Sequence, residues 1–349
     1  MKAMVYRQTG GPEVIVAEDI EIPKPGPGEV LVRMAISGVN PTDWKTRQGD
    51  GSGAAPDDGW QIPDHDGAGR IVEVGDGVDP GRVSERVWLW LAAYQRPWGT
   101  AAEFTVVPAS QAVPLGSASY ELGASLGVPF ITAHRALTVG ATVPDRLGPG
   151  TLSGRTVLVQ GGAGAVGNAA IQLARWAGAI VIATVSSPEK ARLAEDAGSR
   201  HVLDYRRQDI VAEVRKIAPN GVDVIVEVNA VENAATDVAV LGLHGTVVLY
   251  AATADESLTI PIRPMMTIGA RWQFVLLYTE TAESKAAAVE DLQAAVAERA
   301  VRVDDEAGLP LHRFDLNHTG SAHAAVAAGA VGKVLITINA DPTTDVPNT

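Results

Sequence analysis

The stretch TVLVQGGAGAVGNAAIQLARWAG, from Thr156 to Gly178, decides the fold expected for this chain. An apolar run leads into three glycines with the spacing Gly-x-Gly-x-x-Gly, at Gly162, Gly164 and Gly167, and an amphipathic segment follows. A strand, a tight glycine turn and a helix in this order hold the pyrophosphate of a dinucleotide. Glycine is needed because a Cβ would keep the backbone N–H groups from the phosphate oxygens, and the helix N-terminus attracts the anion. The stretch therefore predicts dinucleotide binding.

Length and composition limit the remaining possibilities. A chain of 349 residues suggests two domains, each large enough for its own core. The chain has no cysteine, which excludes disulfides, iron–sulfur clusters, thiolate zinc sites and cysteine nucleophiles. A formal net charge of −13 without a basic block argues against a nucleic-acid partner. Because no apolar run reaches about 18 residues and the start lacks the apolar core of a signal peptide, we expect no membrane partner and a cytoplasmic location.

The periodicity of apolar residues changes near residue 124. Before this point we expect a small β-rich domain, with strands at 30–36, 69–74, 85–90 and 102–107 and a mobile loop at 49–59. After it, strands and helices alternate. The expected strands are 156–159, 181–184, 201–203, 222–226, 245–249 and 272–276, which form a doubly wound parallel sheet of an α/β protein.

The helices expected in the second half are 129–137, 165–177, 188–197, 209–217, 282–300 and 320–328. Two further strands are expected at 312–314 and 333–338. The last residues, 341–349, are polar and contain proline, so we expect a disordered tail.

The end of the second strand indicates which dinucleotide is bound. Folds that bind NAD usually have a carboxylate there, on the adenosine ribose. Here the strand ends in Ser186 and Ser187, with Lys190 one turn into the next helix. Hydroxyls and an ammonium suit a 2′-phosphate, so we expect NADPH. Ser187 is also a good helix N-cap before a proline, and the two interpretations are compatible.

Further motifs extend over nearly the whole chain. They are GGPEV at 10–14, PGPGEVLV at 25–32, GVNPTDWK at 38–45, GTAAE at 99–103, the glycine turn, SSPEK at 186–190 and GKVL at 332–335. Together they resemble the zinc-free quinone oxidoreductase (zeta-crystallin-like) branch of the medium-chain dehydrogenase/reductase superfamily. The resemblance implies a GroES-like catalytic domain, residues 1–128 and 280–349, and a Rossmann NADPH-binding domain, residues 129–279. It also implies a homodimer, with the strand at 272–276 as a candidate interface.

The sequence departs from the zinc-dependent relatives at their metal ligands. Two cysteines and a histidine are expected there, whereas this chain has Asn40, His65 and Val128. One plausible ligand of three remains, and a zinc site needs at least three protein donors. We therefore expect no metal. The alternative is a new metal site formed by Asp64, His65 and Asp66, and otherwise His65 is a hydrogen-bonded residue near the cleft.

The resemblance also implies which residues surround substrate and cofactor. Asn40, Asp43, Trp44 and Lys45 are expected around the nicotinamide and the substrate. Several quinone reductases carry a tyrosine where Lys45 stands, so a phenol proton donor is not transferred to this chain. Lys45 could orient an anionic substrate or stabilise an enolate, or it could be a surface lysine. Asp43 could equally form an Asx turn, and Trp44 could be core packing.

The cofactor contacts come partly from the motif and partly from the resemblance. Ala165 and Val166 begin the helix after the glycine turn and should touch the pyrophosphate. Tyr205 is expected near the adenosine phosphate, with ordinary half-buried packing as its alternative. The other expected contacts are Thr132, Asn229, Tyr250, Ala251, Phe274, Leu276 and Lys333.

The expected activity follows from the absence of zinc ligands. Zinc polarises a simple carbonyl, so hydride transfer without it favours acceptors that are already electrophilic. We therefore expect an NADPH-dependent, zinc-independent oxidoreductase acting on a quinone or another small α,β-unsaturated carbonyl. One alternative is an enoyl reductase of a lipid or polyketide pathway. Another, of a different class, is a non-catalytic, crystallin-like NADPH-binding protein.

Overall fold

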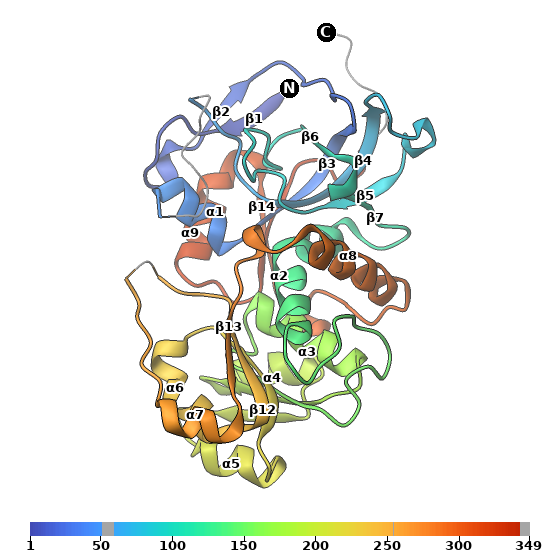
Figure 1. Ribbon diagram of the computed structural model, residues 1–349. Helices are drawn as coiled ribbons and strands as arrows, with labels where there is room; N and C mark the ends of the chain where they lie inside the picture. The colour runs from blue at the N-terminus through green and yellow to red at the C-terminus, as the bar shows by residue number, and fades with distance from the viewer. Residues whose placement is uncertain (51–58, 254, 343–349) are drawn as a thin grey trace. The chain divides into compact units, whose positions relative to one another are not determined.

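A computed structural model describes residues 1–50, 59–253 and 255–342 (Figure 1). The chain forms two compact units. Unit 1 consists of residues 1–128 and 311–349, and unit 2 of residues 129–310. Most of the predicted loop at 49–59 and of the predicted tail at 341–349 lies outside the described residues. No helix in the described part of the chain is long and apolar enough to cross a membrane.

Unit 2 is built around a six-stranded parallel sheet, as the alternation of strands and helices predicts. The strand order is β10-β9-β8-β11-β12-β13. The strands are β8 (Thr156–Val159), β9 (Ile180–Val185), β10 (His201–Asp204), β11 (Val222–Glu227), β12 (Leu241–Leu249) and β13 (Arg271–Phe274). Because β8 and β11 lie at the centre, their residues are nearly all buried, and this explains their continuous apolar runs.

Helices connect these parallel strands, and the last α-helix of unit 2 follows the last of them in the chain. They are α3 (Ala165–Trp176), α4 (Pro188–Asp196), α5 (Ile210–Ile217), α6 (Ala230–Val240), α7 (Ile262–Ile268) and α8 (Ala282–Ala297), with short 3₁₀ helices at Leu277–Thr279 and Asp305–Ala307. The order of the strands reverses between β8 and β11, which lie side by side. Strand β9 is the other neighbour of β8, and β12 is the other neighbour of β11. Ligands of doubly wound sheets bind at the carboxyl ends of the strands at such a switch point.

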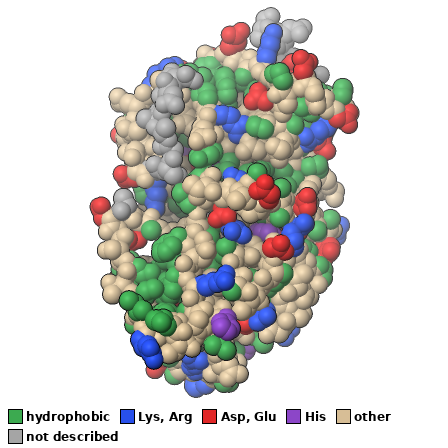
Figure 2. Space-filling view, viewed as in Figure 1, with side chains coloured by type: hydrophobic (Ala, Val, Ile, Leu, Met, Phe, Trp, Pro, Cys, Tyr) green, Lys and Arg blue, Asp and Glu red, His purple; other side chains and the backbone are tan. Residues whose placement is uncertain are grey.

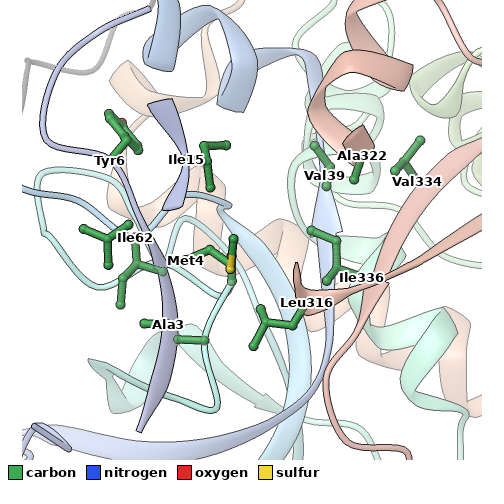
Figure 3. Close-up of a cluster of buried hydrophobic side chains, with 13 residues drawn as sticks. Ala3, Met4, Tyr6, Ile15, Val39, Ile62, Leu316, Ala322, Val334 and Ile336 are labelled. Atoms are coloured by element: carbon green, nitrogen blue, oxygen red, sulfur yellow. The ribbon is translucent and has the colours of Figure 1, made fainter. Parts of the chain in front are cut away.

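Unit 1 joins the two ends of the chain in a seven-stranded sheet. Its strands are β3 (Glu29–Val39), β4 (Asp66–Val74), β5 (Arg86–Leu89), β6 (Phe104–Pro108), β7 (Ala112–Pro114), β14 (Leu311–Asp315) and β15 (Lys333–Thr337), and a separate hairpin pairs β1 (Lys2–Val5) with β2 (Val16–Asp19). Strand β15 lies antiparallel to β3, with Val334 opposite Val39. Figure 3 shows the buried cluster in which side chains from both ends, such as Met4 and Ile336, pack together.

The helices of unit 1 are short. They are α1 (Pro41–Gln48) and α9 (Thr319–Ala327), with 3₁₀ helices at Pro12–Val14, Pro80–Arg82, Ala109–Gln111 and Leu316–His318. Helix α2 (Tyr120–Thr138) contains the boundary between the units and has a non-helical residue at Gly127, two residues before Pro129. A proline inside a helix removes one backbone hydrogen bond and clashes with the preceding turn, which accounts for the kink.

The second boundary between the units differs from the predicted one. It falls at 310/311, whereas the sequence suggested 279/280. The reason is a polar anchor on α8. The buried Asp291 accepts hydrogen bonds from Arg146 (2.6 Å) and the Leu147 N–H (2.7 Å), and it contacts His134 Nε2 at 2.8 Å. These contacts hold α8 within unit 2.

Candidate functional site

The glycine turn lies at the carboxyl end of β8, and its three motif glycines have different surroundings. A Cβ on Gly162 would lie 2.9 Å from Ala183 Cβ, and one on Gly167 would lie 2.4 Å from the Gly161 carbonyl oxygen. Both positions therefore need glycine for close packing of the turn against α3 and β9. Gly164 is exposed, and its nearest neighbour would be 3.5 Å away. This is the position where a ligand could approach the backbone.

The residue that needs a left-handed backbone lies just before the motif. Gly161 has φ +71°, a conformation that favours glycine. The motif spacing did not single it out, although the pair Gly161-Gly162 was a signal for a tight turn. After it, Gly164 is the N-cap of α3, and Ala165 and Val166 are half-buried at the helix start. Because Gly164 has no side chain, it makes no capping hydrogen bond to the first N–H groups of α3. These N–H groups are therefore able to bind an anion.

The residues predicted at the adenosine end lie beside the neighbouring strand ends. Ser187 is the N-cap of α4, and its Oγ accepts a hydrogen bond from the Lys190 N–H at 3.3 Å. Ser186 is half-buried just before it. Tyr205 follows β10, has 53% of its surface exposed, and donates its N–H to the Val185 carbonyl at 3.1 Å. The cap therefore exists, and the contact with a ribose phosphate remains a prediction.

Four of the predicted cofactor contacts share one cavity of about 560 Å³ in unit 2. Tyr250, Ala251, Phe274 and Leu276 line it, together with Ala230 and Val231 of α6 and neighbouring residues. The structure thus brings together the ends of β12 and β13, as expected from their parallel arrangement. Asn229 is exposed and precedes the lining residue Ala230. Thr132 is buried in α2 and is not part of the lining.

Unit 1 contains a buried polar cluster formed by Asn40, Asp66 and Lys333. The Lys333 ammonium donates to Asn40 Oδ1 at 2.7 Å and lies 3.2 Å from Asp66 Oδ2. Asn40 Nδ2 donates to the same Asp66 oxygen at 2.7 Å, and the Val128 N–H donates to Asp66 Oδ1 at 2.9 Å. Burial raises the pKa of Asp66, and the positive charge of Lys333 opposes this shift.

A second buried pair, Asp43 and His65, adjoins this cluster through α1. Asp43 Oδ2 accepts from the Asn40 N–H at 2.6 Å, and Asp43 Oδ1 lies 2.6 Å from His65 Nδ1. Burial favours the neutral form of both side chains. The attraction between them outweighs it, so the pKa of Asp43 is lowered and that of His65 is raised. Both carboxylate oxygens of Asp43 are bonded within unit 1, and its predicted place near the nicotinamide stays a prediction.

The remaining two residues predicted around the substrate lie next to each other on α1. Both are partly exposed, and the Lys45 ammonium lies 5.9 Å from the centre of a ring of Trp44. This is within the range of a cation–π contact. Unlike Asn40 and Asp43, neither belongs to the buried cluster, so these two side chains are the better candidates for contact with a ligand.

The residues at the positions of the zinc ligands do not fit a metal. Asn40 and Asp66 are bonded to an ammonium, Val128 has no side-chain donor, and His65 is paired with Asp43. Asp64, the other candidate, is bonded to Ser37 and His323 at 2.8 Å each. In the described ranges, no group of three or more His, Asp or Glu side chains has the arrangement of a metal site. The positively charged ammonium of Lys333 lies among these polar atoms instead.

The fold and the glycine turn define the chain as a medium-chain dehydrogenase/reductase. The model of the alcohol dehydrogenase GroES-like domain matches residues 26–117, and that of the zinc-binding dehydrogenase family matches residues 165–294. The quinone oxidoreductase of Rattus norvegicus is 30% identical over 343 residues, covering 96% of this chain and 97% of the rat protein. The chain belongs to the quinone oxidoreductase family of this superfamily.

Solved structures support the same assignment. A mycobacterial quinone oxidoreductase has a TM-score of 0.81 at 28% identity, covering 97% of this chain and 99% of that one. A mycobacterial protein in complex with NADPH has a TM-score of 0.79 at 29% identity, covering 97% of this chain and all of that one.

Proposed function

We propose that this chain is an NADPH-dependent, zinc-independent reductase that transfers hydride to a quinone or another α,β-unsaturated carbonyl. The observation that carries the proposal is the glycine turn at the switch point, with Ser186, Ser187 and Lys190 at the neighbouring strand end. The strand tip itself has no carboxylate, and the nearby Glu189 in the first turn of α4 is hydrogen-bonded to Ser187. An acidic residue at the strand tip, where NAD-specific folds usually have one, would repel a 2′-phosphate, whereas hydroxyls and an ammonium attract it. The mycobacterial relative in complex with NADPH is consistent with this choice of cofactor.

The polar cluster of unit 1 supports chemistry without a metal. The bound dinucleotide would supply the hydride, and the acceptor must be electrophilic without Lewis-acid help. We assign Asn40, Asp43 and Lys333 positioning roles, because their polar atoms hold α1, β4 and β15 together. Trp44 and Lys45 are the proposed substrate contacts. Lys45 would orient an anionic acceptor or stabilise the enolate that forms after hydride addition.

An activity assay with chelator-treated protein tests this proposal. NADPH oxidation would be followed against a quinone, an enone and an enoyl thioester. We expect turnover that is unchanged by chelation, because the residues at the metal positions do not form a site. The fastest acceptor separates a quinone reductase from an enoyl reductase. Loss of turnover on chelation contradicts the metal-free mechanism, and tight NADPH binding without turnover on any acceptor favours the non-catalytic alternative.

Replacing Ser187 with aspartate should change the cofactor preference. Aspartate is an N-cap as good as serine, so α4 should keep its stability. The new carboxylate should repel the 2′-phosphate and weaken NADPH binding by about tenfold or more, which corresponds to about 1.4 kcal/mol. Ser187→Asn, which keeps the cap without the charge, is the matched control. Dissociation constants for NADPH and NADH measure the effect, and an unchanged ratio in Ser187→Asp contradicts the assignment.

We also propose that the chain forms a homodimer through the edge of the unit 2 sheet. Strand β13 is the last strand of that sheet in the described part of the chain, so one side of its backbone is unpaired. Large apolar side chains on and near it are exposed, including Phe274 (66%), Ile262 (76%) and Met266 (67%). Figure 2 shows hydrophobic side chains gathered over α6 and α7. An apolar patch beside an open edge is typical of a surface that pairs with another chain.

A further inference from the structure

A network of buried polar side chains is hydrogen-bonded to the glycine turn. Gln160 follows β8 and Glu227 ends β11, and these two strands are neighbours at the switch point of the sheet. Both side chains are buried, as is Asp237 on α6. Polar groups are rarely buried at the centre of a parallel sheet unless each is hydrogen-bonded. The network therefore has a specific arrangement, which the motif analysis did not identify.

One arm of the network reaches the glycine turn. The Gly161 N–H donates to Thr184 Oγ1 at 3.3 Å, and Thr184 Oγ1 donates to Gln160 Oε1 at 2.6 Å. The Gln160 amide then donates from Nε2 to Asp237 Oδ1 at 3.0 Å. Gly161 is the residue with the left-handed backbone at which the turn begins. The position of the turn is thus connected to a carboxyl group on α6.

The other arm reaches the turn between β11 and α6. The Glu227 carboxylate accepts hydrogen bonds from the Asn229 N–H and from Asn233 Nδ2, the latter at 3.0 Å. Asn229 begins α6, and the next residue lines the cavity of unit 2. The two backbone segments that border the switch point are therefore attached to the two ends of one network.

The two arms meet at Asp237 and Glu227, whose carboxyl groups are close enough to interact electrostatically. Asp237 Oδ2 is buried and has no N–H or O–H donor among the described residues. Burial and, after it, the negative charge of Glu227 raise the pKa of Asp237 to about 9, although the hydrogen bond from Gln160 opposes this shift. A proton on Asp237 Oδ2 completes the network, because the carboxyl can then donate to Glu227.

Other ionisable groups near the pair do not replace this proton. Tyr250, at the end of β12, lies near Glu227. Its burial and, as a smaller cause, the negative charge of Glu227 raise the pKa of the Tyr250 phenol, which stays neutral. From α5, the Arg215 guanidinium bonds to the Ala239 carbonyl at 2.6 Å instead of to a carboxylate. From β8 and β9 the contacts are the neutral Gln160 and Thr184.

We propose that a protonated Asp237 donates to Glu227 and thereby positions the glycine turn and the β11–α6 turn for dinucleotide binding, so that the bound state requires the proton on Asp237. This inference rests on the proposed NADPH site. It makes Asp237 and Gln160 positioning residues, because neither needs to touch the cofactor. Loss of the proton leaves the negative charges of Asp237 and Glu227 next to each other in a buried site. It also removes the O–H donor that joins the two arms of the network.

The proposal predicts a specific pH dependence of NADPH binding. If only the protonated form binds, the dissociation constant rises by about tenfold for each pH unit above the pKa of Asp237. We expect constant affinity from neutral pH to near the pKa and a loss of about tenfold by about pH 10. NADPH fluorescence titrations of the full chain across this range measure it.

Asp237→Asn tests the role of the proton. The amide keeps an acceptor for Gln160 and places an N–H donor toward Glu227, as the protonated acid does. We expect neutral-pH affinity within about twofold of the natural chain and no loss at alkaline pH. Asp223→Asn, at the opposite end of β11, is the matched control and should keep the alkaline loss. Glu227→Gln is a second variant, which removes the like charge and should also flatten the profile.

A second readout does not need the ligand. The native state holds a proton on Asp237 that the unfolded chain releases at ordinary carboxyl pKa values, so the melting temperature should fall as pH rises toward about 9. Asp237→Asn should reduce this fall. An alkaline loss of NADPH affinity that persists in Asp237→Asn overturns the proposal while leaving the NADPH site intact. No NADPH binding at any pH overturns both, whatever the melting profile shows.

Discussion

Replacing Gly167 with valine should abolish most NADPH binding. Its Cβ would lie 2.4 Å from the Gly161 carbonyl oxygen and 3.0 Å from Gly162 Cα, which are backbone atoms that cannot move without displacing the turn. Overpacking of this kind costs about 1–3 kcal/mol of folding free energy. A displaced turn also loses hydrogen bonds to the pyrophosphate. If two are lost, at about 1.5–3 kcal/mol each, affinity should fall about 100-fold or more.

Gly164→Ala is the matched variant, because the free chain has room for a methyl group there. The backbone of Gly164 has φ −77°, which alanine adopts without strain. We expect a melting temperature near that of the natural chain and weaker NADPH binding, because the methyl group would stand where the phosphate approaches. Equal affinity in Gly164→Ala and the natural chain would show that the pyrophosphate binds elsewhere. Melting curves and fluorescence titrations separate the two effects.

The sheet of unit 2 could be predicted because each of its signals is local. In β8 and β11 nearly every residue is buried on both faces, so their apolar runs are visible without knowledge of their neighbours. The glycine turn depends on three positions within six residues. The N-cap at Ser187 is likewise decided within one turn of helix. Such features need only short-range spacing, and all of them appear in the structure.

The polar clusters could not be predicted, because their members are far apart in the sequence. Lys333 contacts Asn40 and Asp66 from the other end of the chain, and the sequence did not indicate these partners, only a cofactor contact that stays a prediction. Asp237 and Gln160 are 77 positions apart. The available signal was weak: Glu227 is a charged residue at the end of an apolar strand that precedes a helix. Which partner satisfies a buried charge is decided by the fold, so the pairing appears only with coordinates.

The position of the second boundary between the units, at 310/311 and not at 279/280, also depends on contacts between residues far apart in the sequence. Sequence patterns place a helix at 282–300 but do not indicate the unit to which it belongs. The decisive contacts are those of Asp291 with His134 and Arg146, about 150 positions earlier in the chain. An acidic residue on a helix usually faces solvent, so its burial was not evident from spacing.

Replacing Lys333 with methionine should strongly destabilise unit 1. Methionine fills a similar volume, but it leaves the fully buried Asp66 without its cation and Asn40 Oδ1 without its donor. Removing one member of a buried ion pair costs about 3–5 kcal/mol of unfolding free energy. Five of the seven tryptophans lie in unit 1, so intrinsic fluorescence during urea unfolding reports mainly on this unit.

The double variant Lys333→Met/Asp66→Asn distinguishes an uncompensated charge from lost packing. Because the second change removes the charge, it should recover most of the lost stability. In the single variant the pKa of Asp66, already raised by burial, should rise further without Lys333. The folded state then binds a proton that the unfolded chain lacks, so the variant should be more stable at about pH 5 than at about pH 8. An equal loss at both pH values, with no recovery in the double variant, would mean that Lys333 stabilises unit 1 through packing alone.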